Sequence, residues 1–398
     1  MGGNTQKHDS DITKTKSYSS DSYTEIAEKC TECMKCVAEC DFLKKYGSPK
    51  KIADSSLSGD SEYLKYSFEC SLCGLCDSVC PCGLKPADMF LAMRCESVNL
   101  GIAPFKAHSP ILSYEKKGTS KLFTYYSIPE NCDTVFFPGC TFTGSRPEST
   151  MAVLDILRKK DFSTGIVLDC CCKPSHDLGR MDYFNSMFSE MRTFLLESGI
   201  KKIIVACPNC HKVFSSYGSP LEVITIYEVL ADSEFSSDKP LLKSSSITIH
   251  DPCVLRDCTK IHDSVRKMAA ISGCTLSEMK HSRERTLCCG EGGAAGFLDK
   301  ELADSWKVKR SKEAGNNHLI TYCAGCSNKL GGLVKTSHII DFVIDSEKAL
   351  TGKTKVSKAP FTYLNRLLVK WKIKKNDKSP ITRERNFSPG KGKKIIGL

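Results

Sequence analysis

Two cysteine runs of identical spacing constrain this chain more than any other sequence feature. In each run the cysteines follow the pattern C-x2-C-x2-C-x3-C, and Pro81 follows the second run. The first run consists of Cys30, Cys33, Cys36 and Cys40, and the second of Cys70, Cys73, Cys76 and Cys80. Three thiolates so close together can surround one side of a metal site, but the fourth ligand must come from elsewhere in the chain. The two runs are therefore expected to complete each other's sites.

The cysteine content favours metal ligation over disulfide bonds. The chain has 398 residues with 24 cysteines and 40% apolar residues, which is enough for two or three compact domains. It has no apolar run long enough to span a membrane, and its polar N-terminus lacks the apolar core of a signal peptide. Gln6 stands where N-myristoylation requires serine or threonine. We therefore expect a cytoplasmic chain, whose thiols stay reduced and available to metals.

The two runs resemble the ligand runs of bacterial two-cluster ferredoxins, in which the fourth cysteine of each run binds the other cluster. The resemblance implies two [4Fe–4S] cubanes. Cys30, Cys33, Cys36 and Cys80 would hold one, and Cys70, Cys73, Cys76 and Cys40 the other. Zinc is the competing metal, but two complete copies of this spacing would have no purpose in tetrahedral zinc sites. The long insert 41–69 and the apolar helical spacing in 86–101 are similar to the α-helical ferredoxin module of fumarate reductase iron–sulfur subunits.

From about residue 133 onward, strand and helix patterns alternate, and the same order occurs twice. Each half begins with a buried apolar strand that ends at a cysteine. An amphipathic helix, a loop with adjacent cysteines, a second helix and a strand ending in C-x2-C follow. We therefore expect two α/β domains with mostly parallel sheets, and cysteines at the carboxyl ends of the strands, where such sheets bind ligands.

Each half presents five thiolates from three loops. In the second half they are Cys253, Cys288, Cys289, Cys323 and Cys326. In the first half they are Cys140, Cys207, Cys210 and two of the adjacent residues Cys170, Cys171 and Cys172. The pairs Cys170–Cys171 and Cys171–Cys172 both fit the spacing of the second half, so both stay open. Five ligands exceed what tetrahedral zinc or an ordinary cubane needs, and adjacent cysteines can bind two irons of an open cluster.

This duplicated pattern resembles the cysteine-rich CCG domains of heterodisulfide reductase. Related domains occur in the iron–sulfur subunits of anaerobic glycerol-3-phosphate dehydrogenase and glycolate oxidase. The domain order over residues of about 28–345 is similar to the single-chain catalytic subunit of membrane-linked heterodisulfide reductase. The resemblance implies a noncubane [4Fe–4S] cluster in each CCG domain and a disulfide cleaved between them. Gly290 matches the family's glycine after the paired cysteines, whereas Cys172 or Lys173 stands there in the first half.

The other chemically versatile residues have ordinary structural interpretations. Cysteines beyond the eighteen ligands are expected in apolar cores, and Cys82 is also placed to shape a cluster pocket. The glycine-rich segment 290–296 lacks the preceding strand and following acid of a dinucleotide site, so no flavin or nicotinamide site is predicted. Lys173, His176, His211 and His250 adjoin the ligand cysteines. We expect them to support the sites, and no catalytic residue is assigned.

The positive charge of the chain belongs to its C-terminal segment. The formal net charge is +11, but residues 351–398 hold 14 basic and 2 acidic side chains, so the rest of the chain is nearly neutral. This distribution argues against nucleic acid as a partner. Phe361, Leu364, Leu368 and Trp371 recur at helical spacing among basic residues. Such a helix can lie on an anionic membrane, bind a partner protein or pack on its own domain, and the sequence leaves the three interpretations open.

These inferences define a domain organisation. We expect a disordered tail over 1–27, a two-cluster ferredoxin-type domain over 28–108, a linker over 109–132, CCG domains over 133–243 and 244–350, and a basic amphipathic tail over 351–398.

The predicted function is that of an iron–sulfur oxidoreductase. Electrons would pass from a donor protein, a flavoprotein or a ferredoxin, through the two cubanes to the noncubane clusters, which reduce a disulfide or a similar acceptor. The alternative is an electron-relay subunit of a membrane-associated dehydrogenase that delivers electrons to quinone, located at the inner face of the membrane. A zinc scaffold without redox activity is the third hypothesis.

Overall fold

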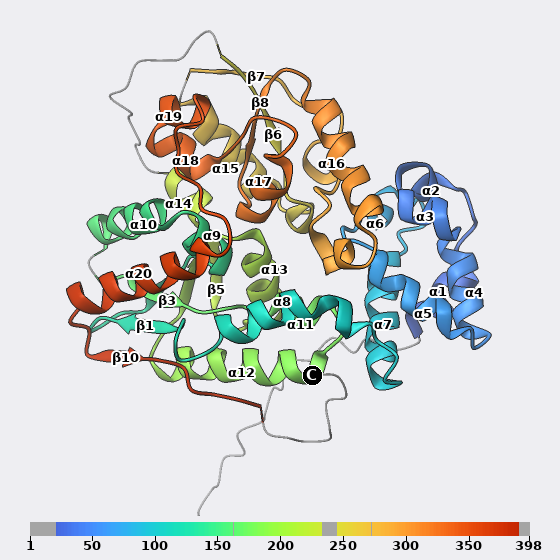
Figure 1. Ribbon diagram of the computed structural model, residues 1–398, viewed down its shortest axis with the longest axis horizontal. Helices are drawn as coiled ribbons and strands as arrows, with labels where there is room; N and C mark the ends of the chain where they lie inside the picture. The colour runs from blue at the N-terminus through green and yellow to red at the C-terminus, as the bar shows by residue number, and fades with distance from the viewer. Residues whose placement is uncertain (1–20, 162, 233–244, 272, 390–398) are drawn as a thin grey trace, which may run out of the picture.

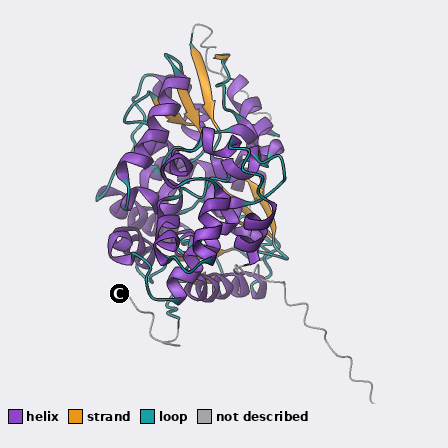
Figure 2. Cartoon of the chain, turned by 90° about the vertical axis from the view of Figure 1, so that its right-hand side faces the viewer, coloured by secondary structure: helices purple, strands orange, loops and turns teal. Residues whose placement is uncertain are grey.

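The computed structural model describes residues 21–161, 163–232, 245–271 and 273–389, which form three connected modules (Figure 1). The helical module lies at the right of Figure 1, and the two α/β domains make up the rest, with the second above the first in this view. Figure 2 looks from the side of the helical module and shows helices over most of this side, with the strands among and behind them. The predicted fold class is confirmed.

The helical module is built around the two cysteine runs. It contains α1 (Asp21–Lys29), α2 (Lys35–Glu39), α3 (Asp41–Tyr46), α4 (Pro49–Leu57), α5 (Ser61–Tyr66), the 3-10 helix η1 (Ser67–Glu69), α6 (Leu75–Val79) and α7 (Pro86–Asn99). Most of these helices are too short to be stable alone and depend on tertiary packing. Phe42, Met89 and Phe90 lie in the core that they share.

The first α/β domain follows the connecting helix α8 (Phe105–Gly118). It contains β1 (Tyr125–Ile128), β2 (Thr134–Phe137), α9 (Cys140–Ser145), α10 (Pro147–Lys160), β3 (Gly165–Leu168), α11 (Lys173–Asp177), α12 (Met181–Glu197), β4 (Lys202–Val205), α13 (Pro208–Tyr217), β5 (Glu222–Thr225) and α14 (Ile226–Ala231). Strands β3, β2, β4 and β5 are parallel neighbours in this order. Val135 pairs with both Gly165 and Ile203. Apart from their first residues, the central strands β2 and β4 are apolar and buried, because helices cover both faces of a parallel sheet.

The second α/β domain repeats this plan with fewer strands. It contains β6 (Ser246–His250), η2 (Cys253–Leu255), α15 (Thr259–Ala270), β7 (Thr275–Leu276), η3 (Arg283–Arg285), η4 (Gly292–Phe297), α16 (Lys300–Ala314), β8 (His318–Thr321), α17 (Ala324–Leu330), β9 (Thr336–His338), α18 (Ile339–Ile344) and α19 (Ser346–Leu350). The strand order is β7-β6-β8-β9, and all pairs are parallel. Apolar residues of both domains, among them Phe136, Tyr227 and Ile249, form one continuous core.

The C-terminal segment folds back onto the first α/β domain. Helix α20 (Phe361–Asn376) packs on α9 and α10, and β10 (Ile381–Arg383) pairs antiparallel with β1 at the edge of the sheet. The sheet therefore has the complete order β10-β1-β3-β2-β4-β5. Of the three interpretations of the basic segment, packing on its own domain is what the structure shows.

Three of the expected segment assignments need correction. The disordered tail predicted for 1–27 is wrong for its last residues, because α1 is anchored there by buried Tyr23 and Ile26; residues 1–20 lie outside the described residues. The expected linker 109–132 contains most of α8 and all of β1. The segment 351–398 is no separate tail in its described part, because α20 and β10 complete the first α/β domain.

Two buried arginines hold the three modules together. Arg94 of α7 donates hydrogen bonds to carbonyl oxygens of all three: Ser67 and Cys70 in the helical module, Asp177 in the first α/β domain and Gly293 in the second. Arg256 of the second α/β domain donates similarly to the Cys73 carbonyl, 3.2 Å from Nη2. Backbone carbonyls of the second cysteine run accept these hydrogen bonds. The docking of the modules therefore restrains the positions of these cysteines.

Candidate metal centres

The two cysteine runs of the helical module share an unusual backbone geometry. In the first run Glu32 and Met34 have positive φ angles of 48° and 59°, and in the second Leu72 and Gly74 have 48° and 67°. Non-glycine residues rarely adopt this left-handed conformation. Its repetition at matching positions winds each C-x2-C-x2-C segment into a loop before a short helix, α2 or α6. Each run therefore forms a tight loop, which keeps its first three cysteines close together.

The structure brings the cysteines together across the two runs. One cavity is lined by Cys30, Cys33, Cys36 and Cys80, and Cys76 and Cys82 also border it. A second cavity is lined by Cys40, Cys70, Cys73 and Cys76. The fourth cysteine of each run therefore lies with the first three of the other, in the predicted crossed arrangement.

Burial makes several of these thiols poor acids unless a cation is present. Desolvation is the largest effect on Cys36 and Cys40, and it raises their pKa values to about 11 and about 12. Desolvation likewise raises the pKa of Cys76 well above its usual range, and the negative charge of Asp77 adds to the effect. Buried thiols at neutral pH therefore keep their protons until a metal displaces them. Four converging soft sulfur donors fit an iron–sulfur cluster.

The first α/β domain gathers its cysteines at the carboxyl ends of β2, β3 and β4. Cys140 contacts Cys170, while Cys171 contacts Cys210 at the start of α13. Cys207 is in contact with Cys210. Gly139 permits this convergence, because a Cβ atom there would lie 2.9 Å from the Cys207 Cβ atom.

The second α/β domain contains the equivalent contacts. Cys253 contacts Cys288, and Cys289 contacts Cys326. Cys323 in turn contacts Cys326. By position in the fold, Cys288 and Cys289 thus correspond to Cys170 and Cys171, which selects between the two pairs that the sequence left open.

Cys172 occupies the position of the glycine in the second domain. Gly290 has a φ of +88°, and its N–H lies 3.2 Å from the Cys288 sulfur. Cys172 has a φ of +57° and is fully buried, and its thiol is directed at the Cys170 carbonyl at 3.6 Å. A side chain in this conformation is strained, but the first domain has room for it. Cys172 was named among the candidate ligands; its thiol contacts that of Cys170, but it stands at the position of Gly290 and matches no cysteine of the second domain.

The cysteine sites lie close to one another in a defined order. Cys73 of the helical module contacts Cys288 of the second α/β domain. The buried Tyr227 hydroxyl donates to the carbonyls of Ala206, at 2.6 Å, and Tyr322, which precede the C-x2-C segments of the first and second domains. The helical module thus adjoins the second domain's site, which in turn lies beside the first domain's site.

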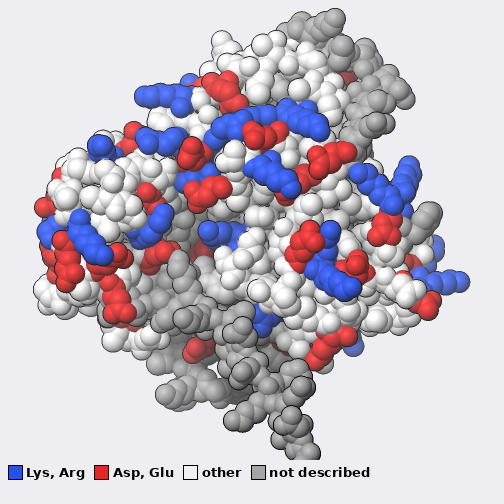
Figure 3. Space-filling model, turned by 180° about the vertical axis from the view of Figure 1, so that it is seen from behind, with Lys and Arg blue, Asp and Glu red and all other residues white. Residues whose placement is uncertain are grey.

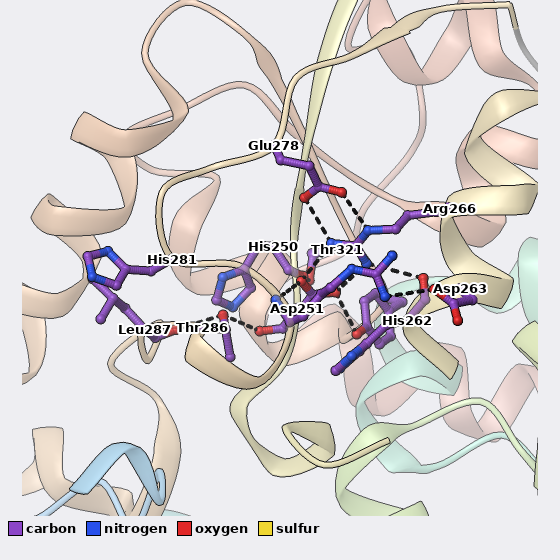
Figure 4. Close-up of polar contacts among 12 residues, drawn as sticks. His250, Asp251, His262, Asp263, Arg266, Glu278, His281, Thr286, Leu287 and Thr321 are labelled. Carbon is purple, nitrogen blue, oxygen red and sulfur yellow. Dashed lines mark hydrogen bonds and ion pairs between the residues drawn. The ribbon is translucent and has the colours of Figure 1, made fainter. Parts of the chain in front are cut away.

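A polar network around Asp251 holds the loop that leads from β6 to Cys253 (Figure 4). Arg266 donates two hydrogen bonds of 3.0 Å to the Asp251 carboxylate, and the Tyr322 hydroxyl donates a third of 2.9 Å. Thr286, just before the cysteine pair, donates to the Asp251 carbonyl. The network fixes two cysteine loops relative to each other.

Histidine and carboxyl groups adjoin the cysteines. Arg310 Nε donates to His250 Nδ1 at 3.1 Å, and a ring nitrogen of His250 lies within 4.8 Å of the sulfurs of Cys289 and Cys326. Desolvation, and then the nearby Cys207 and Cys140, raises the pKa of Glu291 to about 7. Glu291 was missed by the sequence analysis, because only the fold brings it near cysteines of the other domain.

The remaining candidate residues lie at the edges of these sites. Lys173 forms an ion pair of 2.6 Å with Asp177, and His176 contacts both Asp177 and the Tyr217 hydroxyl at 2.9 Å. Lys173 and His176 line a cavity of about 260 Å³ between the three modules. Burial lowers the pKa of His211, which does not border this cavity.

The cysteines outside the sites are mostly core residues, as expected. Cys95 and Cys132 are buried, whereas Cys258 and Cys274 are half-buried and pack against the core. Cys82 is exposed and borders the first cavity.

Two family models match this chain in the regions that hold these cysteines. The 4Fe-4S dicluster domain matches residues 26–84, and the cysteine-rich CCG domain matches twice, at residues 134–215 and 247–331. The chain belongs to the iron–sulfur proteins that combine a 4Fe-4S dicluster domain with two CCG domains. A dicluster domain implies two cubanes, and CCG domains bind iron–sulfur clusters. The expected family is confirmed.

Several curated proteins that this chain resembles are named as reductases or oxidoreductases. One component of the dihydromethanophenazine:CoB–CoM heterodisulfide reductase from Methanosarcina barkeri is 25% identical over 340 residues, which cover 76% of this chain and 83% of that protein. One component of fumarate reductase (CoM/CoB) from Methanothermobacter marburgensis is 28% identical over 75% of this chain and 66% of its own length. The probable iron-sulfur-binding oxidoreductase FadF of Bacillus subtilis is 28% identical over 42% of this chain and 25% of its own length. The chain is thus an iron–sulfur oxidoreductase and a distant homologue of the heterodisulfide reductase component.

Solved structures add nothing to this assignment. An aspartate racemase of Picrophilus torridus aligns with 58% of this chain and 99% of its own, at a TM-score of 0.25 and 11% identity. That likeness is too weak to carry an argument.

Proposed function

We propose that this protein receives single electrons at the helical module and delivers them to a disulfide at the CCG domains. The observation that carries the proposal is the contact between Cys73 and Cys288, which joins the second cysteine group of the helical module to the second CCG site. A separate zinc scaffold would not need its sites in contact, whereas electron transfer does.

The proposed ligands follow from the groups that converge. One cubane would be held by Cys30, Cys33, Cys36 and Cys80, and the other by Cys40, Cys70, Cys73 and Cys76. The first CCG site would use Cys140, Cys170, Cys171, Cys207 and Cys210, and the second Cys253, Cys288, Cys289, Cys323 and Cys326. Five thiolates with an adjacent pair support noncubane clusters in the CCG domains. Clusters held there would supply one-electron transfer.

Two electrons and two protons convert one disulfide into two thiols. The adjacency of the C-x2-C segments, bridged by Tyr227, supports binding of the disulfide between the two CCG sites. The Glu291 carboxyl lies near cysteines of both domains and is suited to hold a proton there. Electrons would enter from a flavoprotein or a ferredoxin at the exposed Cys33 and Met34, which border the first cavity.

An anaerobic turnover experiment tests this function. The full chain, loaded with iron and sulfide, is mixed with reduced methyl viologen and a panel of low-molecular-weight disulfides, and released thiols are counted against oxidised viologen. We expect two thiols per two electrons, and about sixteen irons per chain. Cys289→Ala should abolish thiol release, whereas Cys274→Ala, at a core position, should not. Loaded protein that reduces none of the disulfides would refute the proposal, and zinc without acid-labile sulfide would refute any redox function.

A relay to a membrane acceptor is the second candidate. It is favoured by one observation, the apolar outer face of α20, where Phe361 is 62% and Trp371 58% exposed. None of the helices in the described ranges is long and apolar enough to cross a bilayer, so a relay would have to reach the membrane from its surface. Reoxidation of the reduced protein by a quinone analogue, with no reaction toward disulfides, would select this candidate.

A further inference from the structure

Helix α20 carries two apolar faces, and only one of them is used by the fold. Its inner face holds Arg366, Val369 and Ile373, all buried against the first α/β domain. Asn365 Nδ2 donates to the Gly144 carbonyl at 2.8 Å, and Arg366 Nη2 donates to the Gly118 carbonyl at 3.2 Å. The helix is therefore anchored in one orientation, which fixes the direction of the opposite face.

The outer face of α20 is an exposed apolar stripe. The stripe consists of Phe361, Leu364, Leu368 and Trp371, which are 62%, 54%, 53% and 58% exposed. Their spacing of three, four and three residues places them along one side of the helix. Other large apolar residues exposed to this degree in the described chain, such as Leu100 and Leu122, belong to different segments. Four such side chains in line indicate an interaction surface.

The charge around the stripe has one sign. Residues 353–375 contain eight lysine and arginine residues and no aspartate or glutamate. Lys370 and Lys374 pair with Glu384, but Lys372 and Lys375 are exposed beside the stripe, and the Lys375 ammonium lies 5.1 Å from the Trp371 ring centre. On the face seen from behind, by contrast, the two signs are mixed (Figure 3).

We propose that the outer face of α20 docks this protein on an anionic lipid surface. The helix would lie flat, with the stripe at the boundary between headgroups and acyl chains and the lysines among the anionic headgroups. A tryptophan suits that boundary, because its ring is apolar and its N–H is polar. The positive charge beside the stripe favours an anionic lipid surface, because a neutral protein surface would not attract these cations.

The docked orientation would bring the first CCG site near the membrane. Arg366, on the inner face of the same helix, lies in a small cavity with Cys140, and Gly118 fits between its guanidinium and Cys170. Cysteine site and lipid surface would thus be separated by little more than the diameter of one helix, about 10–12 Å. This geometry holds whether the electron acceptor is a disulfide or a membrane-dissolved carrier.

Vesicle flotation of the full, cluster-loaded chain tests the proposal. Vesicles of phosphatidylglycerol and phosphatidylcholine should carry the protein upward, vesicles of phosphatidylcholine alone should carry much less, and about 0.5 M salt should weaken the binding. The variant L364S/L368S/W371S should partition about 1,000-fold less, because each of the three large apolar side chains contributes roughly a factor of ten. Substitution is preferable to deletion of 351–398, since α20 and β10 complete the first domain.

The control variant L57S/L333S removes exposed leucines of other modules, 48% and 50% exposed, and should bind like the wild type. Visible absorption and circular dichroism check that each variant is folded and loaded. Vesicle binding that is equal in the wild type and the stripe variant would overturn the proposal, as would no binding to anionic vesicles. Concentration-dependent self-association that the stripe substitutions abolish, without vesicle binding, would assign the face to a second copy and also overturn it.

Discussion

At the scale of single residues, the CCG sites depend on backbone conformation as much as on sulfur chemistry. Cys172 and Gly290 occupy the same left-handed position after the paired cysteines. A glycine reaches this conformation without strain, and a cysteine does not. The first domain tolerates the cysteine because its side chain has a buried place beside the Cys170 carbonyl. Cys172 therefore adds a buried thiol beside Cys170 that has no counterpart among the cysteines of the second domain.

This difference gives a prediction for iron content. Cys171→Ala should lose about four irons per chain, because it removes one of five converging sulfurs. Cys172→Gly should keep all the iron and change stability little, since relief of the strain at φ +57° offsets the loss of a buried side chain. Metal analysis and thermal unfolding under argon measure both effects. If Cys172→Gly loses iron while Cys170→Ala keeps all of it, Cys171 and Cys172 are the pair that holds the cluster.

A second residue, Glu115, makes stability depend on pH. It accepts hydrogen bonds from the Ser175 N–H and hydroxyl, yet desolvation raises its pKa from 4.5 to about 7. The folded state therefore holds this proton more tightly than the unfolded state, so its contribution is lost as pH rises from about 4.5 through 7. At about pH 8, Glu115→Gln should recover on the order of 3 kcal/mol in unfolding free energy. Urea unfolding at about pH 5 and about pH 8 measures this, and Glu62→Gln, at an exposed site, should change neither value.

At the scale of elements, the last strand positions a cysteine loop. Arg385, two residues after β10, is fully buried and pairs with Asp169 at 3.2 Å and Glu190 at 2.8 Å. Asp169 also accepts hydrogen bonds from the Tyr126 hydroxyl, at 2.5 Å, and the Cys170 N–H, at 2.6 Å. A segment at the end of the chain thus fixes the loop that carries the first domain's paired cysteines.

Arg385→Met should therefore weaken the whole domain. Removing the arginine leaves the buried Asp169 carboxylate without its cation, which typically costs about 3–5 kcal/mol, so a loss of about 3 kcal/mol in unfolding free energy is expected. The control is Lys378→Met, an exposed cation in the same segment. Denaturant unfolding of both variants provides the comparison. If Arg385→Met unfolds like the control, the buried arginine does not stabilise the domain.

At the scale of the whole molecule, Arg94 couples the three modules. Its guanidinium bonds four backbone carbonyls from all three modules and is completely buried. Burial lowers its pKa to about 10, so it still carries its charge at neutral pH. No single module offers acceptors for all the N–H groups of this guanidinium. Arg94 can therefore be buried only when the three modules are docked together.

Arg94→Gln should separate the modules before they unfold. Several buried carbonyls would lose their donors, at roughly 1–3 kcal/mol each. Small-angle scattering should show a larger radius of gyration, and electron transfer from a reduced donor to the CCG sites should slow. Arg192→Gln is the matched control, because that guanidinium bonds the Tyr217 and Ser219 carbonyls within one domain. An unchanged radius with normal electron transfer would show that Arg94 does not hold the modules together.

The amino-acid sequence by itself determined which residues gather sulfur and in what kind of fold. Cysteine spacing is local, so C-x2-C-x2-C segments, strand periodicity and the duplication predicted the helical module and both α/β domains. Only the tertiary structure decided that Cys170 and Cys171 are the two adjacent cysteines that correspond to Cys288 and Cys289. It alone also decided that Cys73 contacts Cys288 and that Arg94 is buried between the three modules. These depend on contacts between residues far apart in the chain, and spacing carries no information about which distant segments share a buried surface. The basic C-terminal helix was ambiguous for the same reason, since an amphipathic pattern does not reveal which of its faces the fold will cover.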